Sequence, residues 1–126
     1  MINGRSKGAG GEREFCRFLQ ETLGLQKTPE RNLDQVRNGG ADINEITPFM
    51  FEVKRCEGLA KRDWWVQVKK ASNTVPGTIP VVAYRQNRKP WRFLISAEYI
   101  GLDLGFVQLE EFEFVNWIKN YYGINE

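Results

Sequence analysis

Between positions 12 and 24, the residues that favour burial repeat at the spacing of an α-helix. The repeating positions are Phe15, Phe18, Leu19, Thr22 and Leu23. Gly24 ends this pattern, and the glycines from Gly8 to Gly11 predict a flexible approach to the helix. Glu12 lies three residues before Phe15 and seven before Leu19, so it falls on the same stripe. We expect the Glu12 carboxylate to point inward from the first turn.

Residues 49–55 alternate in the manner of a β-strand. Three side chains face one way and three the other, with Phe49, Phe51 and Val53 opposed to Met50, Glu52 and Lys54. The Glu and Lys side chains therefore lie on one face, about 7 Å apart along the strand. A shorter strand is predicted over residues 41–46, with a turn at Thr47-Pro48. A strand between others should not present Glu and Lys to an interior without a functional cause.

After this strand, the pattern returns to helical spacing. Residues 57–62 predict a loop, and Asp63 is expected to cap a helix over residues 64–71 or 64–72. The predicted inner face of this helix carries Trp65, Val68 and Ser72. Gln67 lies beside that face, so we expect it near whatever the helix covers.

Pro76 and Gly77 break the chain before the remaining elements. Residues 80–85 and 91–96 predict an antiparallel hairpin around residues 86–90. Residues 106–109 predict a short strand, and residues 110–122 a helix with an acidic start. The order is helix, about three strands, helix, two strands and a C-terminal helix. It indicates an α/β domain with a central mixed β-sheet flanked by helices.

Length and residue types narrow the possible chemistry. At 126 residues the chain has the size of one domain, so we expect a single domain over residues 1–126. Histidine is absent, which excludes Ser-His and Cys-His catalysis and any zinc site built on histidine. A bound metal would then need oxygen ligands, which favours magnesium or manganese.

Three features predict an intracellular, cytoplasmic protein that does not enter a membrane. The two cysteines, Cys16 and Cys56, lie far apart without a CxxC pairing, which is typical of reduced thiols. The first eight residues lack the apolar core of a signal peptide. No apolar run approaches the roughly 20 residues that a membrane span needs.

Basic residues are concentrated in the middle of the chain. Between Lys54 and Arg92 there are ten basic and two acidic residues, whereas one basic and six acidic residues follow. Such a segment suits a polyanionic partner, and it equally fits the solvated faces of a helix and a hairpin. Trp64, Trp65 and Trp91 lie among these bases and could stack on nucleic acid. Tryptophan side chains are, however, more often buried in a core.

Two carboxylates and a lysine occur together between Asp42 and Lys54. Asp42 and Glu52, with the backbone carbonyl of Val53, would supply oxygen ligands to a divalent cation that polarises a phosphoryl oxygen. Lys54 would hold or deprotonate an attacking water, or stabilise charge on the phosphate. Glu12 could add a further ligand. The same residues could instead form salt bridges on a solvated sheet face, because Asp followed by Glu-x-Lys is a common pattern.

Several segments in this order carry a family resemblance. They are Lys7-Gly8, Glu12-Arg13-Glu14, Arg31, Arg37, Gly39-Gly40-Ala41-Asp42-Ile43, Phe51-Glu52-Val53-Lys54 and the helix that bears Gln67. Together they resemble the PD-(D/E)XK nuclease superfamily, and more closely the small archaeal-type and phage-type Holliday-junction resolvases. The likeness spans about residues 4–96, which leaves residues 97–126 as a C-terminal extension. The proline that usually precedes the metal-binding Asp is replaced here by Ala41.

The resemblance implies a restriction-endonuclease-like fold and a Mg²⁺-dependent endonuclease, with Mn²⁺ able to substitute. Glu12, Asp42, Glu52 and Lys54 would form the active site, and Gln67 would help to position the lysine or the water at the metal. The resemblance also implies a homodimer, branched DNA as the partner and no small-molecule cofactor. The residues expected to contact nucleic acid are Lys7, Arg13, Arg31, Arg37, Arg55, Lys61, Arg62 and Lys69.

The leading interpretation is therefore a structure-selective DNA endonuclease that resolves four-way junctions. Two alternatives stay open. One is a PD-(D/E)XK nuclease that acts on flaps or unbranched DNA. The other is a non-catalytic nucleic-acid-binding module whose carboxylates serve structure. That module predicts metal-independent, strongly salt-dependent binding and no cleavage with any divalent cation.

Overall fold

The computed structural model describes residues 4–25, 48–55, 57–102 and 105–122. Its elements are α1 (Gly4–Leu23), β1 (Phe49–Arg55), α3 (Lys61–Asn73), β2 (Ile79–Arg85), β3 (Arg92–Ser96), the 3₁₀-helix η1 (Ala97–Ile100), β4 (Phe106–Glu110) and α4 (Glu111–Tyr122). The strand predicted over residues 41–46 lies outside the described residues. None of the described helices is both long and apolar enough to cross a bilayer.

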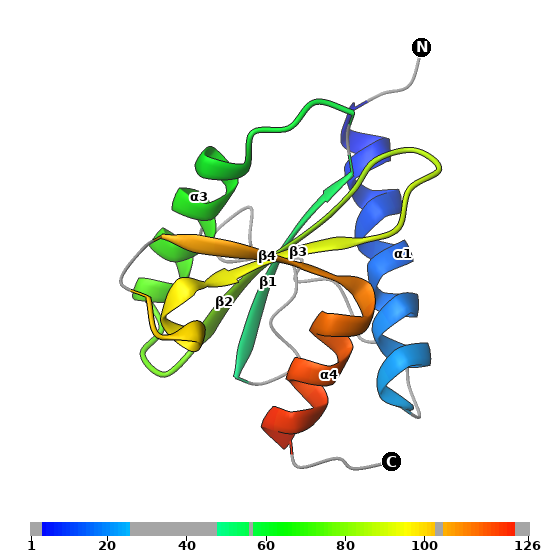
Figure 1. The fold of residues 1–126 in the computed structure, drawn as a ribbon. Helices are drawn as coiled ribbons and strands as arrows, with labels where there is room; N and C mark the ends of the chain where they lie inside the picture. The colour runs from blue at the N-terminus through cyan, green and yellow to red at the C-terminus, as the bar shows by residue number, and fades with distance from the viewer. Residues whose placement is uncertain (1–3, 26–47, 56, 103–104, 123–126) are drawn as a thin grey trace.

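The described strands form one mixed sheet in the order β1-β2-β3-β4. β1 and β2 run parallel, with Arg55 opposite Arg85, and α3 makes the crossover that a parallel pair requires. β2 and β3 run antiparallel, which confirms the predicted hairpin, and β4 pairs antiparallel with β3. Figure 1 shows α3 on one side of this sheet and α1 with α4 on the other. The predicted α/β class, a mixed sheet flanked by helices, is confirmed.

The sheet face covered by α1 and α4 holds an aromatic-rich core. The odd-numbered residues of β1 point to this side because successive strand residues alternate. The largest fully buried side chains of this core are Phe15, Leu19, Phe49, Phe51, Phe93, Ile95, Phe114 and Ile118. The rings of Phe15 and Phe51 meet edge to face, with centroids 5.1 Å apart. This contact ties α1 to β1, the two elements that carry Glu12 and Glu52.

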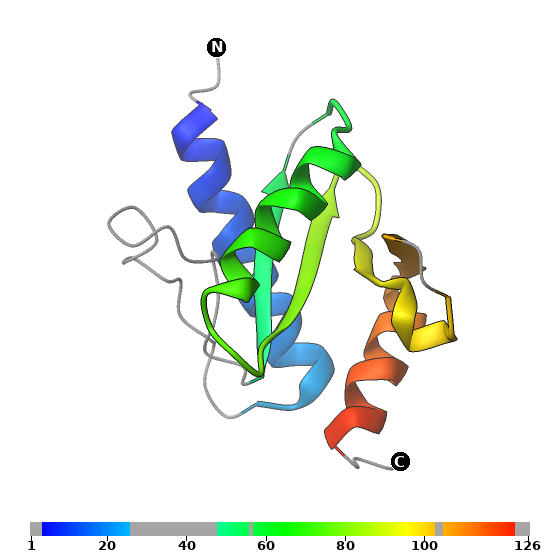
Figure 2. The same ribbon diagram turned by 90° about the vertical axis from the view of Figure 1, so that its left-hand side faces the viewer.

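The opposite face is covered by α3 and is partly polar. Figure 2 is seen from this side and shows α3 in front of β1 and β2. The apolar cluster here consists of Trp64, Trp65, Val68, Val82, Tyr84 and Leu94. On β1, Met50 packs against Ala71 of α3, and Glu52 and Lys54 occupy the next positions on the same face. Polar side chains therefore replace the apolar core at this end of β1.

Core burial of the tryptophans that lie among the bases is confirmed. Trp64 and Trp65 are each 7% exposed and Trp91 is 3% exposed. Trp64 packs against the ring of Tyr84, with centroids 5.3 Å apart. These indoles serve the two cores, so they do not supply a stacking surface for nucleic acid.

α1 begins earlier than the sequence pattern indicated. The glycines from Gly8 to Gly11 were predicted to form a flexible approach, and this is wrong, because the helix starts at Gly4 and includes them. The reason lies at Gly11, where a Cβ atom would come within 2.6 Å of the Cβ of Arg55. Glycine allows the helix backbone to pack directly against β1, and this packing outweighs its low helix propensity.

The start of α3 corrects a second prediction. Lys61 is the first helical residue, and the N-cap is Ala60, without a side-chain capping hydrogen bond. Residues 61 and 62 are therefore helical and not part of a loop. Asp63 lies in the first turn instead of capping the helix, and its negative charge is favourable there through the helix dipole. The inner face is as predicted, with Trp65, Val68 and Ser72 buried.

Other predicted boundaries are confirmed. α1 ends at Leu23, directly before Gly24, whose φ is +67°. The Leu25 N–H donates to the Gln20 carbonyl at 3.0 Å, as in a Schellman motif. β4 is the short strand predicted over residues 106–109, and α4 is the predicted C-terminal helix. The sequence pattern did not predict η1, which follows β3 directly.

Candidate active site

Glu52 and Lys54 lie on the α3 face of β1, as the alternation predicted. The Glu52 side chain is nearly buried, whereas a quarter of the Lys54 side chain is exposed. Lys54 Nζ lies 3.3 Å from Glu52 Oε1, so the two form an ion pair. A buried carboxylate paired with a lysine that reaches solvent is the centre of the candidate site.

Gln67 of α3 closes this pair into a triangle. Its Nε2 donates to Glu52 Oε1 at 2.8 Å, and its Oε1 accepts a hydrogen bond from Lys54 Nζ at 3.1 Å. One amide can make both contacts because it carries a donor group and an acceptor group. Gln67 thus fixes the carboxylate and the ammonium relative to each other. We refer to Glu52, Lys54 and Gln67 as the triangle.

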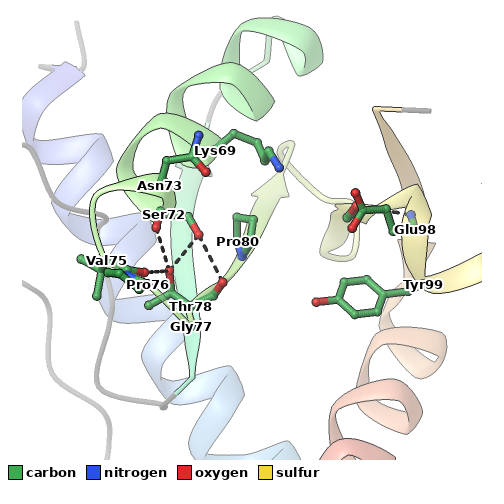
Figure 3. Close-up of a pocket in the computed structure, with 11 residues that line it drawn as sticks. Lys69, Ser72, Asn73, Val75, Pro76, Gly77, Thr78, Pro80, Glu98 and Tyr99 are labelled. Carbon is green, nitrogen blue, oxygen red and sulfur yellow. Dashed lines mark hydrogen bonds between the residues drawn. The ribbon is translucent and has the colours of Figure 1, made fainter. Parts of the chain in front are cut away.

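The C-terminal end of α3 is tied to the start of β2 by hydroxyl groups, as Figure 3 shows. Ser72 Oγ and Thr78 Oγ1 lie 2.8 Å apart, and the Thr78 hydroxyl also contacts the carbonyls of Ser72 (3.1 Å) and Val75 (2.8 Å). Together with the contact between Met50 and Ala71, these bonds hold α3 on the sheet. The position of Gln67 over β1 follows from this docking.

A cavity of about 340 Å³ lies beside the same end of α3 (Figure 3). Its lining includes Lys69, Asn73, Glu98 and Tyr99. Gln67 and Lys69 are two positions apart, about 200° around a helix, so the cavity and the triangle lie on opposite flanks of α3. The lining contains one carboxylate and no acidic pair, so this cavity is not part of the candidate active site.

Glu12 approaches the triangle from α1. It is 7% exposed and points inward, as predicted, and its negative charge acts on Glu52. The neighbouring Gly11 explains how this is possible, because the absence of a side chain there brings α1 against Arg55 at the end of β1. A helix on one face of the sheet and a strand side chain that points to the other face therefore contribute the two carboxylates, Glu12 and Glu52.

The environment of Glu52 disfavours its ionised form. Burial raises the pKa of Glu52 above its ordinary value, the charge and hydrogen bond of Lys54 lower it, and the nearby Glu12 raises it again. The net direction is upward. A cation bound between these carboxylates would reverse this balance, because its positive charge favours both ionised forms.

The available donors fit a hard divalent cation. Both Gln67 and Lys54 contact Oε1 of Glu52, and within the described residues no hydrogen bond reaches Oε2. In that same part of the chain, no three His, Cys, Asp or Glu side chains come together as a metal-binding group. The third predicted ligand, Asp42, lies outside it. Carboxylate oxygens from Glu12 and Glu52 suit magnesium or manganese, whereas zinc prefers nitrogen and sulfur.

Comparison with protein families matches residues 3–106 to the family described as "Phage putative PDDEXK endonuclease". The match covers 104 of the 126 residues. The chain belongs to this PD-(D/E)XK nuclease family. Glu52-Val53-Lys54 on β1 has the order acid, any residue, lysine that the family description abbreviates. The match also extends ten residues beyond the core predicted at residues 4–96, through η1 to the first residue of β4.

The chain was also compared with individual curated proteins and solved structures. No curated protein matches the sequence of this nuclease. Among solved structures, Hjc, a Holliday junction resolvase from the archaeal hyperthermophile Archaeoglobus fulgidus, matches over 95% of this chain and 98% of its own. The TM-score is 0.49 and the sequence identity 21%. At these values the likeness supports no statement about the activity of this chain.

The predicted nucleic-acid contacts of the nuclease are spread over several elements. Arg13 and Arg62 are exposed, and Lys61 lies over the ring of Tyr84, with Nζ 5.6 Å from the centroid. Lys69 lines the cavity of Figure 3. Lys7 falls within α1, and Arg31 and Arg37 lie outside the described residues. Arg55 forms an ion pair with Glu14 of α1.

An ion-pair group beside the triangle was not predicted. Glu14 of α1 pairs with Arg85 at the end of β2 and with Arg55 at the end of β1, where Arg55 Nε lies 3.7 Å from Glu14 Oε2. These bonds fasten α1 to the carboxyl ends of both parallel strands. The sequence signal was weak, because the two arginines become neighbours only through the register of β1 and β2.

Proposed function

We propose that this nuclease is a Mg²⁺-dependent DNA endonuclease, with Mn²⁺ able to substitute, and that four-way junctions are its substrate. The family supports the nuclease class. The proposed metal dependence rests on two buried carboxylates that lie near each other. Burial raises the pKa of Glu52 in the triangle, and the charge of Glu12 acts on it. Asp42 is proposed as the third acidic ligand on its sequence position alone.

The cation would be held by Glu52, Asp42 and the carbonyl of Val53, with Glu12 as a possible further ligand. When bound, it would stabilise negative charge on the phosphate and lower the pKa of a water molecule. Glu52 is suited to this role because Gln67 and Lys54 both contact Oε1, which fixes the orientation of the carboxylate.

Lys54 would act on the substrate. An ammonium group has three N–H donors, and two of them are directed at Glu52 and Gln67. The third can reach the attacking water or a non-bridging phosphate oxygen, and stabilise the charge that develops there. The partial exposure of the Lys54 side chain allows this contact.

The preference for four-way junctions rests on the sequence resemblance to small resolvases, carried by Glu12-Arg13-Glu14, the Gly39-to-Ile43 segment and Gln67. The same resemblance supports a homodimer that places two active sites on one junction. Sedimentation equilibrium with and without a synthetic junction tests this assembly, and a monomer under both conditions would contradict it.

Cleavage of a synthetic four-way junction with Mg²⁺ tests the proposed function. Glu52→Gln should lower the cleavage rate by about 10³-fold, the usual scale for losing one electrostatic group of an active site. Its affinity for the junction in Ca²⁺ should stay within a few-fold of wild type. Glu21→Gln, at an exposed position of α1, is the matched control and should cleave normally.

Different outcomes separate the alternatives. Cleavage that survives Glu52→Gln would contradict the assigned site. Salt-sensitive binding without cleavage under Mg²⁺ or Mn²⁺ would favour a non-catalytic binding module. Faster cleavage of flaps or linear duplex than of junctions, measured side by side, would keep the nuclease and overturn the junction preference.

A further inference from the structure

The turn between β2 and β3 presents two basic side chains at one end of the sheet. Arg88 and Lys89 are both exposed at its tip. In Figures 1 and 2 this turn lies at the end toward which β1 and β2 point. Lys54 and Arg55 lie at the same end, because the register of the parallel pair places Arg55 opposite Arg85. The two bases are therefore on the active-site end of the molecule.

The turn is held from the side of β1 by Glu57. The Glu57 carbonyl accepts a hydrogen bond from Gln86 Nε2 at 2.8 Å, and its Oε1 accepts one from the Asn87 N–H at 2.6 Å. Glu57 follows Lys54 by three residues, which is at most about 10 Å of chain. The segment that leaves the active site thus positions the turn directly.

The turn is also closed from within. The Lys89 N–H donates to the Gln86 carbonyl at 3.2 Å, and Arg85 Nε donates to the Lys89 carbonyl at 2.7 Å. Arg85 is in turn paired with Glu14 of α1. Four hydrogen bonds around a turn of this size fix its backbone, although its side chains face solvent.

Arg88 has an unusual backbone conformation. Its φ is +63°, and among the described residues no other non-glycine residue has a positive φ. It is the third residue of the turn that the Lys89–Gln86 bond closes, where turns with positive φ favour glycine or asparagine. A side chain with a Cβ is disfavoured there, so arginine is not the residue that backbone stability alone would select.

We propose that the tip of this turn is a phosphate-binding site, in which Arg88 and Lys89 contact the DNA backbone beside the cleaved bond. This inference rests on the proposed function, because the ligand is the phosphate chain of the substrate. Arg88 takes a strained conformation within a turn that Glu57 holds through Gln86 and Asn87, and its side chain is exposed at the same end of the sheet as Lys54.

Binding in Ca²⁺ at several salt concentrations tests the site. Arg88→Ala and Lys89→Ala should each weaken junction binding about three- to tenfold and lower the slope of log affinity against log salt by about one. Arg88→Lys should keep most of the affinity. Lys119→Ala on α4 removes one positive charge elsewhere and is the matched control, with a change of less than twofold.

Substituted DNA gives a second, position-specific readout. A single uncharged methylphosphonate, placed in turn at each phosphate near the cut, should weaken binding of the wild-type protein at the phosphates that the turn contacts. The same substitution should have no further effect on the Arg88→Ala, Lys89→Ala double variant. An equal penalty in both proteins would overturn the proposal.

Arg88→Gly separates a binding role from a structural one. Glycine accepts positive φ without cost, so this variant should melt at the same temperature as wild type or higher, while binding DNA as weakly as Arg88→Ala. The proposal would be overturned if Arg88→Gly bound DNA as tightly as wild type. It would also be overturned if Arg88→Ala and Lys89→Ala weakened binding no more than Lys119→Ala does. Neither result would contradict the assignment as a nuclease. A wild-type protein that neither binds nor cuts DNA would instead remove the proposed function itself.

Discussion

The two faces of β1 are built from alternate residues of one strand, and they differ in what they contribute. The odd positions, Phe49, Phe51 and Val53, pack into the aromatic core under α1 and α4. The even positions begin with Met50 under α3 and continue with Glu52 and Lys54, which meet Gln67. Apolar packing is therefore concentrated on one face and the proposed active site on the other, within a strand of seven residues.

One residue departs from this division between the two faces of β1. Glu12 belongs to α1, on the apolar side, yet its charge acts on Glu52. Close packing at Gly11 brings α1 against the end of β1. The position of Glu12 relative to Glu52 therefore depends on how α1 packs on its side of the sheet. Perturbing each face separately, and then the contact between them, tests this division.

Phe51→Ala should have the largest effect, and it should fall on stability. Phe51 is fully buried and contacts Phe15, so removing its ring should lower the free energy of unfolding by about 3–5 kcal/mol. Urea denaturation measures this loss. Phe51→Leu should lose less and allow kinetics on folded protein, where kcat should stay close to wild type. A large drop in kcat with unchanged stability would contradict the division of the faces.

Gly11→Ala tests the contact between the faces. A Cβ at this position would meet the Cβ of Arg55 at 2.6 Å, so α1 must shift and Glu12 with it. A displacement of about 1 Å can cost about 10²-fold in rate, and we expect a loss of that order in cleavage. Gly10→Ala is the matched control, because nothing lies within 4 Å of a Cβ there. It should keep full activity and gain about 0.5–1 kcal/mol of stability from helix propensity. Equal activity of the two variants would show that Gly11 does not position Glu12.

Gln67→Ala tests the polar face alone. The loss of both hydrogen bonds should lower kcat about 10- to 100-fold, because Glu52 and Lys54 are no longer held together. Gln67 is largely exposed, so the melting temperature should hardly change. A stability loss without a kinetic effect would mean that Gln67 serves only packing.

The smallest expected effect is a pH-dependent gain in stability for Glu52→Gln. Burial raises the pKa of Glu52, so the folded protein binds this proton more tightly than the unfolded chain does. The stability that Glu52 contributes is complete below its unfolded pKa and is lost as the pH rises through the folded pKa. The glutamine variant avoids this loss, so in EDTA it should melt a few degrees above wild type at pH 7.5, where 1 kcal/mol is worth about 4 °C.

The difference in melting temperature should shrink as the pH falls toward 4. Glu21→Gln, which replaces an exposed carboxyl of α1, should show no such trend. If Glu52→Gln were instead less stable than wild type at pH 7.5, the carboxylate would be stabilising and the direction of its pKa shift would be wrong.

Local patterns were sufficient to predict several elements from the sequence. β1 was predicted over the residues that form it, because strict alternation is an unambiguous signal. Gly24 was predicted as the end of α1, because the helix needs a residue that tolerates positive φ there. Predictions failed where packing decided the outcome. Gly8 to Gly11 are helical because α1 docks on β1, and Asp63 does not cap α3 because that helix begins at Lys61.

Some features of the candidate site follow from local sequence patterns, and others depend on tertiary packing. The sequence by itself determined that Glu52 and Lys54 share a face of one strand, that Glu12 points inward, and that oxygen ligands are required of any metal. These conclusions depend on the periods of strands and helices and on residue types, which are local properties. Only the tertiary structure decided that Gln67 bridges Glu52 and Lys54, that Glu14 joins Arg55 and Arg85, and that Gly11 brings Glu12 to the triangle. These contacts join elements that lie up to 71 residues apart in the chain, and they exist only because the register of β1 and β2 and the docking of α1 and α3 bring them together.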